Sequence, residues 1–197
     1  MRFKIWLENL VQQSEKAFTA KKKIQKSDIA SELGFNQPLQ KYAEGSFSTL
    51  YQHPTQQNVL IKVTSHESDA RRAWKAQSLE SLNIVRLLDK PIQKIINGVK
   101  CWILLVEKVT GKSIHYSNVD ILRLYDLFKK YENYIFDYPE SLKILKLYNS
   151  NNEEEHEKLI TLFETMKKLE EINIHLVDLT DNIIDNGQRY VIIDLGF

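Results

Sequence analysis

The order of short apolar segments between residues 38 and 110 constrains the fold of this chain more than any other feature. Three segments with strand character come first: 39–42, 48–51 and 59–63. A helical segment follows at 67–82, and two more strand segments then flank Asn97-Gly98, the dipeptide typical of a two-residue hairpin. The sequence therefore predicts an antiparallel sheet with one helix inserted after its third strand.

The chain after residue 110 has mostly helical periodicity. A capping-box pattern at Ser117 opens one predicted helix, and Asn152, followed by three glutamates, opens another. Before the strands, residues 3–18 carry an apolar stripe at helical spacing, and a short helix is expected at 27–33. We thus expect three parts: an N-terminal helical extension (1–37), a sheet-bearing lobe (38–110) and a reduced helical lobe (111–197).

Composition excludes several classes of protein. The formal net charge of +1 gives no reason to expect nucleic acid as a partner. Cys101 is the single cysteine, which excludes an intramolecular disulfide and a cysteine-based zinc site and favours a reducing compartment. No apolar stretch reaches the length of a membrane span, about 18 residues, and charged residues interrupt the first ten positions. We expect a cytoplasmic protein.

Two polar features accompany the predicted strands. Gly45 and Ser46 lie between the first two strands, where main-chain N–H groups could approach phosphate oxygens without a Cβ in the way. Lys62 ends the third strand and could reach phosphates as a point charge. Each feature also has a simpler explanation, since a lone glycine is often a turn and a strand lysine often protects a sheet edge.

A second polar group closes the chain. Asp178 and Asn182 lie in a short loop. Asp194 follows twelve residues after Asn182 and stands two positions before Gly196. Carboxylate and amide oxygens are ligands that Mg²⁺ accepts, and the other carboxylate of this group could orient a hydroxyl group. Asp and Asn also cap turns in many loops without any catalytic role.

Taken in order, these motifs resemble those of the protein kinase superfamily. Residues 43–51 resemble the glycine-rich loop, 59–62 resemble V-A-I-K, 175–182 resemble H-x-D-x-x-x-x-N, and 194–196 resemble D-[FL]-G. The resemblance implies an α+β, protein-kinase-like two-lobed fold. Its N-lobe would be an antiparallel sheet, and its helical C-lobe would be truncated, because the chain ends at Phe197.

The resemblance also implies roles for individual residues. Asp178 would orient the acceptor hydroxyl, and Lys62 would hold the phosphates of ATP. Gly45 and Ser46 would line the phosphates, and Glu107 to Val109 would form the hinge that grips adenine. Asn182 and Asp194 would bind Mg²⁺. The implied cofactors are ATP and Mg²⁺.

Two departures from the family pattern leave alternatives open. Asp178 comes one residue later than the usual aspartate, and Asp181 is the other candidate base. The acid expected to pair with Lys62 is unassigned, because Lys75 occupies its approximate position. Three acids nearby are alternatives: Glu67, Asp69 and Glu80.

The expected activity is that of a minimal serine/threonine protein kinase that uses Mg-ATP. In size and architecture the chain resembles secreted bacterial effector kinases, which implies a host protein substrate such as a chaperone and an address in the host cytosol. Small molecules or sugars are alternative acceptors, and an inactive pseudokinase is the alternative function. Residues 29–35 also resemble half of a helix-turn-helix, but Pro38 and a strand follow where a recognition helix would stand, which favours a folded cap.

Overall fold

The computed structural model describes most of the chain after residue 25. The described residues are 26–45, 47–114, 118–131, 139–147, 153–176 and 182–195. The chain divides into two compact units, which we call the sheet unit and the helical unit. The sheet unit comprises Met1–Trp74 and Leu87–Lys108, and the helical unit comprises Lys75–Arg86 and Val109–Phe197.

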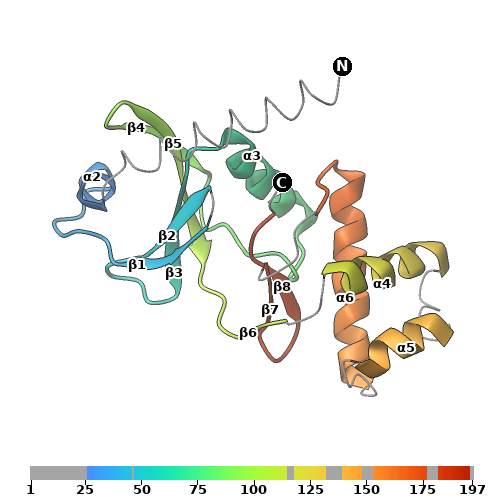
Figure 1. The fold of residues 1–197 in the computed structure, drawn as a ribbon. Coiled ribbons are helices and arrows are strands. Elements are labelled where there is room, and N and C mark those ends of the chain that lie inside the picture. Colours follow the sequence, from blue (N-terminus) through green and yellow to red (C-terminus); the bar gives the residue numbers. More distant parts are fainter. Residues whose placement is uncertain are drawn as a thin grey trace. The chain divides into compact units, whose positions relative to one another are not determined.

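The sheet unit contains a five-stranded antiparallel sheet of order β1-β2-β3-β5-β4 (Figure 1). Its strands are β1 (Lys41–Glu44), β2 (Ser48–Gln52), β3 (Val59–Thr64), β4 (Ile92–Ile96) and β5 (Val99–Glu107). Helix α3 (Glu67–Ala76) follows β3. The predicted α+β class is confirmed, and so is the predicted order of three strands, one helix and two strands.

The β4–β5 hairpin shows why the sequence signal at its turn is reliable. Ile96 pairs with Val99, so Asn97 and Gly98 are the two turn residues. Their φ angles are +51° and +73°, the left-handed values that this tight turn requires at both positions. Asn and Gly adopt such angles at the lowest cost, and the turn therefore fixes the register of both strands.

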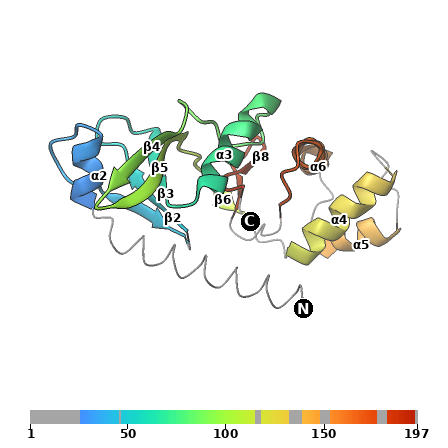
Figure 2. The same ribbon diagram turned by 90° about the horizontal axis from the view of Figure 1, so that it is seen from above.

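One face of the sheet packs on α2 (Lys26–Glu32), which lies beside β4 in Figure 2. Ile29 and Ala30 of α2 are buried against apolar side chains of this face. The residues of this core are Ile29, Ala30, Leu39, Tyr51, Ile61, Val63, Ile96, Cys101 and Ile103. Successive strand residues point to opposite faces, so Lys62, between Ile61 and Val63, points away from α2.

Cys101 gives a direct test of this packing. The side chain is 0% exposed, and burial raises the pKa of its thiol from 9.0 to about 11. At pH 8 we expect iodoacetamide to alkylate Cys101 of the native protein more than about 100-fold more slowly than it alkylates glutathione. The buried thiol has little of the reactive thiolate form at this pH, and the reagent has no access to it. Mass spectrometry with and without urea would measure this rate. Native alkylation as fast as that of glutathione would contradict the packing of α2 on the sheet.

The helical unit is built on α4 (Asn118–Tyr131), α5 (Pro139–Leu147) and α6 (Glu153–Glu171). Tyr125, Phe128 and Phe163 form an aromatic cluster, with ring centroids 5.7–6.5 Å apart. The sequence predicts α4 and α6 but not α5. Among the described residues, no helix is long and apolar enough to cross a membrane.

Helix α3 is shorter than predicted and is shared between the units. It gives way at Gln77 to a 3₁₀ turn, which ends at Glu80 in a left-handed conformation with φ +50°. Its last residue, Ala76, is 1% exposed in the core of the helical unit. The ammonium of Lys75 donates to the carbonyl oxygen of Ile172, just past the end of α6, at 2.5 Å. A cation is favourable at this negative end of a helix dipole.

A small antiparallel sheet completes the helical unit. It contains β6 (Lys112–Ser113), β7 (Ile183–Asp185) and β8 (Tyr190–Ile192), in that order. β7 and β8 form a hairpin that turns at Asn186-Gly187, after the paired Asp185, and β6 is not predicted from the sequence. Its two residues are too few for a periodic pattern.

Candidate functional site

Lys62 is the most unusual polar residue of the sheet unit. It lies on β3, the central strand, and only 8% of its surface is exposed. Leu50 of β2 and Leu104 of β5 are its direct partners, so these aliphatic side chains share its face. Lysine is rarely this buried unless its ammonium is engaged. The alternative interpretation of Lys62 as a protective edge lysine is wrong.

The end of β5, where the sequence analysis expects the hinge, has a defined main-chain direction. The N–H of Lys108 donates to the carbonyl of Asn58 at 2.8 Å, whereas Glu107 pairs with Val59 as its direct neighbour. Because hydrogen-bonded and non-hydrogen-bonded pairs alternate in an antiparallel ladder, the carbonyl of Glu107 points away from β3. This direction suits recognition of a planar ligand edge by main chain. Val109, the next predicted hinge residue, begins the helical unit.

Gly45 lies at the turn between β1 and β2. Its N–H donates to the carbonyl of Ser48 at 3.0 Å. A Cβ at Gly45 would lie 3.7 Å from the hydroxyl of Ser48, which is ordinary contact, so the described protein atoms do not themselves require glycine here. Ser46, the other predicted phosphate-loop residue, lies outside the described residues.

The structure brings Asn182 and Asp194 together in the helical unit. Ile183 pairs with Ile192 across the β7–β8 hairpin, and the N–H of Ile193 donates to the carbonyl of Asn182 at 2.8 Å. Asn182 and Asp194 therefore lie at the open end of one hairpin. Ile183, 0% exposed, and Leu195, 6% exposed, anchor this end in the core of the unit.

An asparagine that the sequence analysis missed supports this hairpin from its other side. The amide of Asn83 donates to the carbonyl of Tyr190 at 2.7 Å, and the carbonyl of Asn83 accepts from the N–H of Ile192 at 2.8 Å. Asn83 is 7% exposed. A single asparagine in an irregular segment carries neither a periodic nor a motif signal, so no pattern points to it.

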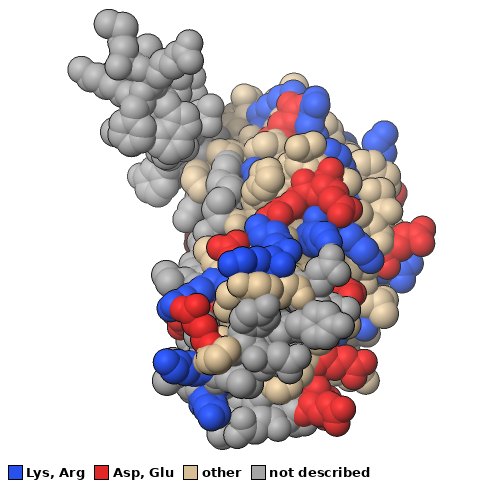
Figure 3. Space-filling view, turned by 90° about the vertical axis from the view of Figure 1, so that its right-hand side faces the viewer, with Lys and Arg blue, Asp and Glu red and all other residues tan. Residues whose placement is uncertain are grey.

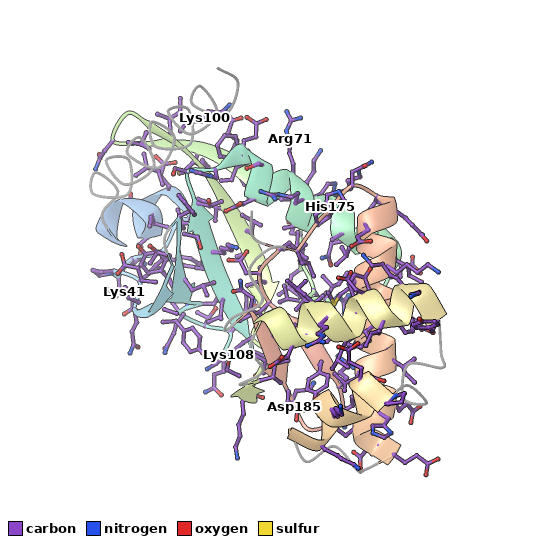
Figure 4. The ribbon with its side chains drawn as sticks, turned by 45° about the vertical axis from the view of Figure 1, so that its right-hand side comes forward. Lys41, Arg71, Lys100, Lys108, His175 and Asp185 are labelled. Atoms are coloured by element: carbon purple, nitrogen blue, oxygen red, sulfur yellow. The ribbon has the colours of Figure 1, made fainter. Side chains whose placement is uncertain are left out.

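The opposite end of the hairpin is held by charge. Lys158 of α6, whose side chain is 10% exposed, forms an ion pair with Asp185 at 3.5 Å. Asp185 also accepts from the N–H of Gly187 at 2.8 Å, which closes the turn. Figure 4 labels Asp185 at this turn. The hairpin that places Asn182 and Asp194 side by side is thus held by contacts at both of its ends.

Asn182 and Asp194 fit Mg²⁺ by their donor chemistry. Among the described residues, no three His, Cys, Asp or Glu side chains gather as a metal cluster. Mg²⁺ does not require one, because it is commonly held by one or two carboxylates together with water and substrate phosphates. One carboxylate and one amide, both offering oxygen, suit that mode and do not suit a structural zinc site.

The segment that is expected to form the catalytic loop, residues 175–182, is described only in part. Asp178 and its alternative Asp181 lie outside the described residues, so the base remains a prediction. His175, the first residue of the segment that resembles H-x-D-x-x-x-x-N, is exposed; Figure 4 labels it. Asn173, in a left-handed conformation, lies two residues past the end of α6. Ile174, between Asn173 and His175, is buried.

The candidate acids for Lys62 have distinct surroundings. Glu67 is ion-paired with Arg71 and, at 3.5 Å, with Lys100; Figure 4 labels both basic residues. The Arg71 guanidinium lowers the pKa of Glu67. Glu80 is exposed beyond α3, and the side chain of Asp69 is 8% exposed. Asp69 is thus the most buried carboxylate of the three.

Comparisons with known proteins add little to these observations. No protein-family model matches the sequence, and no curated protein sequence matches it. Among solved structures, the chain is similar to that of the streptomycin-ATP-APH(2")-IIa ternary complex. Identity is 15%, the match covers 86% of this chain and 68% of that chain, and the TM-score is 0.36.

Proposed function

We propose that this protein is an ATP-dependent phosphotransferase that transfers the γ-phosphoryl group of Mg-ATP to a serine or threonine hydroxyl of a protein. The observation that carries the proposal is the placement of Asn182 and Asp194 at the anchored, open end of the β7–β8 hairpin. An amide and a carboxylate held this way would bind Mg²⁺, which would neutralise negative charge on the nucleotide phosphates.

The sheet unit would supply the nucleotide contacts. Lys62 would place its ammonium on the phosphates, and its aliphatic neighbours Leu50 and Leu104 would contact the flat face of the base. The outward carbonyl of Glu107, followed by Val109, would recognise the edge of adenine. Gly45 and Ser46 would approach the phosphates through main-chain N–H groups.

Asp178 would orient the acceptor hydroxyl and accept its proton as the oxygen attacks phosphorus. A protein hydroxyl is the proposed acceptor, with a host chaperone as one candidate if the protein works inside a host cell. On the face in Figure 3, the basic and acidic side chains of the described residues are interspersed.

A catalytically inactive, nucleotide-binding pseudokinase is the second candidate function. The observation that favours it concerns α3, where Glu67 is engaged by Arg71 and Lys100 and Glu80 lies beyond the helix. An active site would then depend on Asp69 or on another anchor for Lys62.

The test is transfer of label from γ-³²P-ATP with Mg²⁺, with and without a eukaryotic cell lysate, alongside calorimetric titration with ATP. We expect labelled protein that disappears with Lys62→Ala. Binding of ATP without transfer would establish the pseudokinase instead. Failure to bind ATP would overturn both candidates.

A further inference from the structure

The turn that carries Gly45 is joined to the first turn of α3 by one buried hydroxyl. Thr64, the last residue of β3, is 1% exposed. Its Oγ1 lies 3.2 Å from the carbonyl oxygen of Phe47 and 3.2 Å from Oδ2 of Asp69. The N–H of His66 donates to the same oxygen at 3.1 Å. Three separate segments of the sheet unit therefore meet at Thr64.

Aromatic and charged contacts reinforce this junction. The rings of Phe47 and His66 lie 4.6 Å apart. Burial lowers the pKa of His66, which keeps its ring neutral and compatible with the apolar ring of Phe47 at pH 7. Asp69 is in turn 3.7 Å from Arg72 on the next turn of α3. Phe47, in the β1–β2 turn, is thus packed against His66, which directly precedes α3.

We propose that Thr64 is a positioning residue that sets the tip of the β1–β2 turn for contact with nucleotide phosphates, and that Asp69 links this position to α3. The inference rests on the proposed function. The Thr64 hydroxyl has one hydrogen and faces two acceptors, the Phe47 carbonyl and the Asp69 carboxylate. Donation to Phe47 holds the turn, whereas donation to Asp69 releases it.

This arrangement gives Asp69 a role other than pairing with Lys62. An acid on α3 would act on the phosphates through the Phe47 carbonyl and the turn beside Gly45. The junction would then couple any movement of α3 to the phosphate-contacting turn.

The experiment compares Thr64→Val, which removes the hydroxyl at nearly constant volume, with Thr64→Ser, which keeps it. The matched control is Thr165→Val, because Thr165 is a buried hydroxyl of the helical unit that donates to the carbonyl of Thr161 and lies 2.9 Å from the hydroxyl of Ser81. Amide hydrogen exchange by mass spectrometry would cover residues 45–48, and steady-state kinetics would separate KM for ATP from kcat.

In Thr64→Val we expect the rate of amide exchange in residues 45–48 and the KM for ATP each to rise by roughly threefold to tenfold. This change corresponds to the loss of about one hydrogen bond. Thr64→Ser and Thr165→Val should keep both values near wild type. Unchanged exchange in Thr64→Val would overturn the junction, and raised exchange with unchanged KM would overturn its role in nucleotide binding. If wild type itself binds no ATP, the proposed function fails and the nucleotide role of Thr64 with it, while the exchange comparison still decides the junction.

Discussion

Replacing Asp194 with asparagine is expected to reduce phosphoryl transfer by about 10³-fold, the effect of deleting one group that stabilises charge at a reacting centre. The substitution keeps the size and one oxygen of the side chain but removes its charge. Asn182 beside it would be a neutral ligand in the proposed site, so the variant would present two amides and no carboxylate to Mg²⁺. Initial rates with labelled ATP over a range of Mg²⁺ concentrations would measure the loss.

The matched control for Asp194→Asn is Asp185→Asn at the far end of the same hairpin. The amide side chain introduced there would keep an oxygen for the N–H of Gly187 and lose only the charge that faces Lys158. We expect transfer within about threefold of wild type and a stability loss of about 1 kcal/mol. Equal activity of Asp194→Asn and wild type, with Asp185→Asn as a further match, would exclude Asp194 as a metal ligand.

The sheet unit could be predicted from sequence because its signals are local. Asn97-Gly98 defines a turn by the φ angles it allows, and the strands on either side follow from its register. The location of Lys62 on a strand also followed from the apolar run before it. Its central position in the sheet did not, because the order of strands depends on long-range pairing that no short window contains.

The supports of the candidate site were harder to predict because they are non-local. Lys75 contacts a carbonyl 97 residues away, and Asn83 contacts one 107 residues away. Neither contact is indicated by a periodic pattern or by a sequence motif. Thr64 is similar: in sequence it is one more β-branched residue of a strand, and only the fold places Phe47 and Asp69 beside its hydroxyl.

Gly111 is another residue whose role appears only in the fold. Gly111 directly precedes β6, and β6 pairs with β7 so that Lys112 lies opposite Asp185. A Cβ at Gly111 would overlap the main-chain oxygen of Asp185 and lie 2.6 Å from the Cγ2 atom of Ile184. A main-chain atom in a paired strand cannot move aside as a flexible side-chain end can. The close approach of β6 to the hairpin therefore requires glycine.

Gly111→Ala is expected to destabilise the helical unit by about 3 kcal/mol, the upper part of the usual range for overpacking. The control is Gly98→Ala, where φ is +73° but no atom lies within 4 Å of the added Cβ, so backbone strain of about 1 kcal/mol is the only cost. Thermal unfolding would rank the two variants. The added Cβ in Gly111→Ala should displace β7, which directly follows Asn182. This variant should therefore also lower phosphoryl transfer at temperatures where it remains folded, and Gly98→Ala should not. If the two alanine variants were equally stable and equally active, β6 would not lie against the hairpin as closely as Gly111 permits.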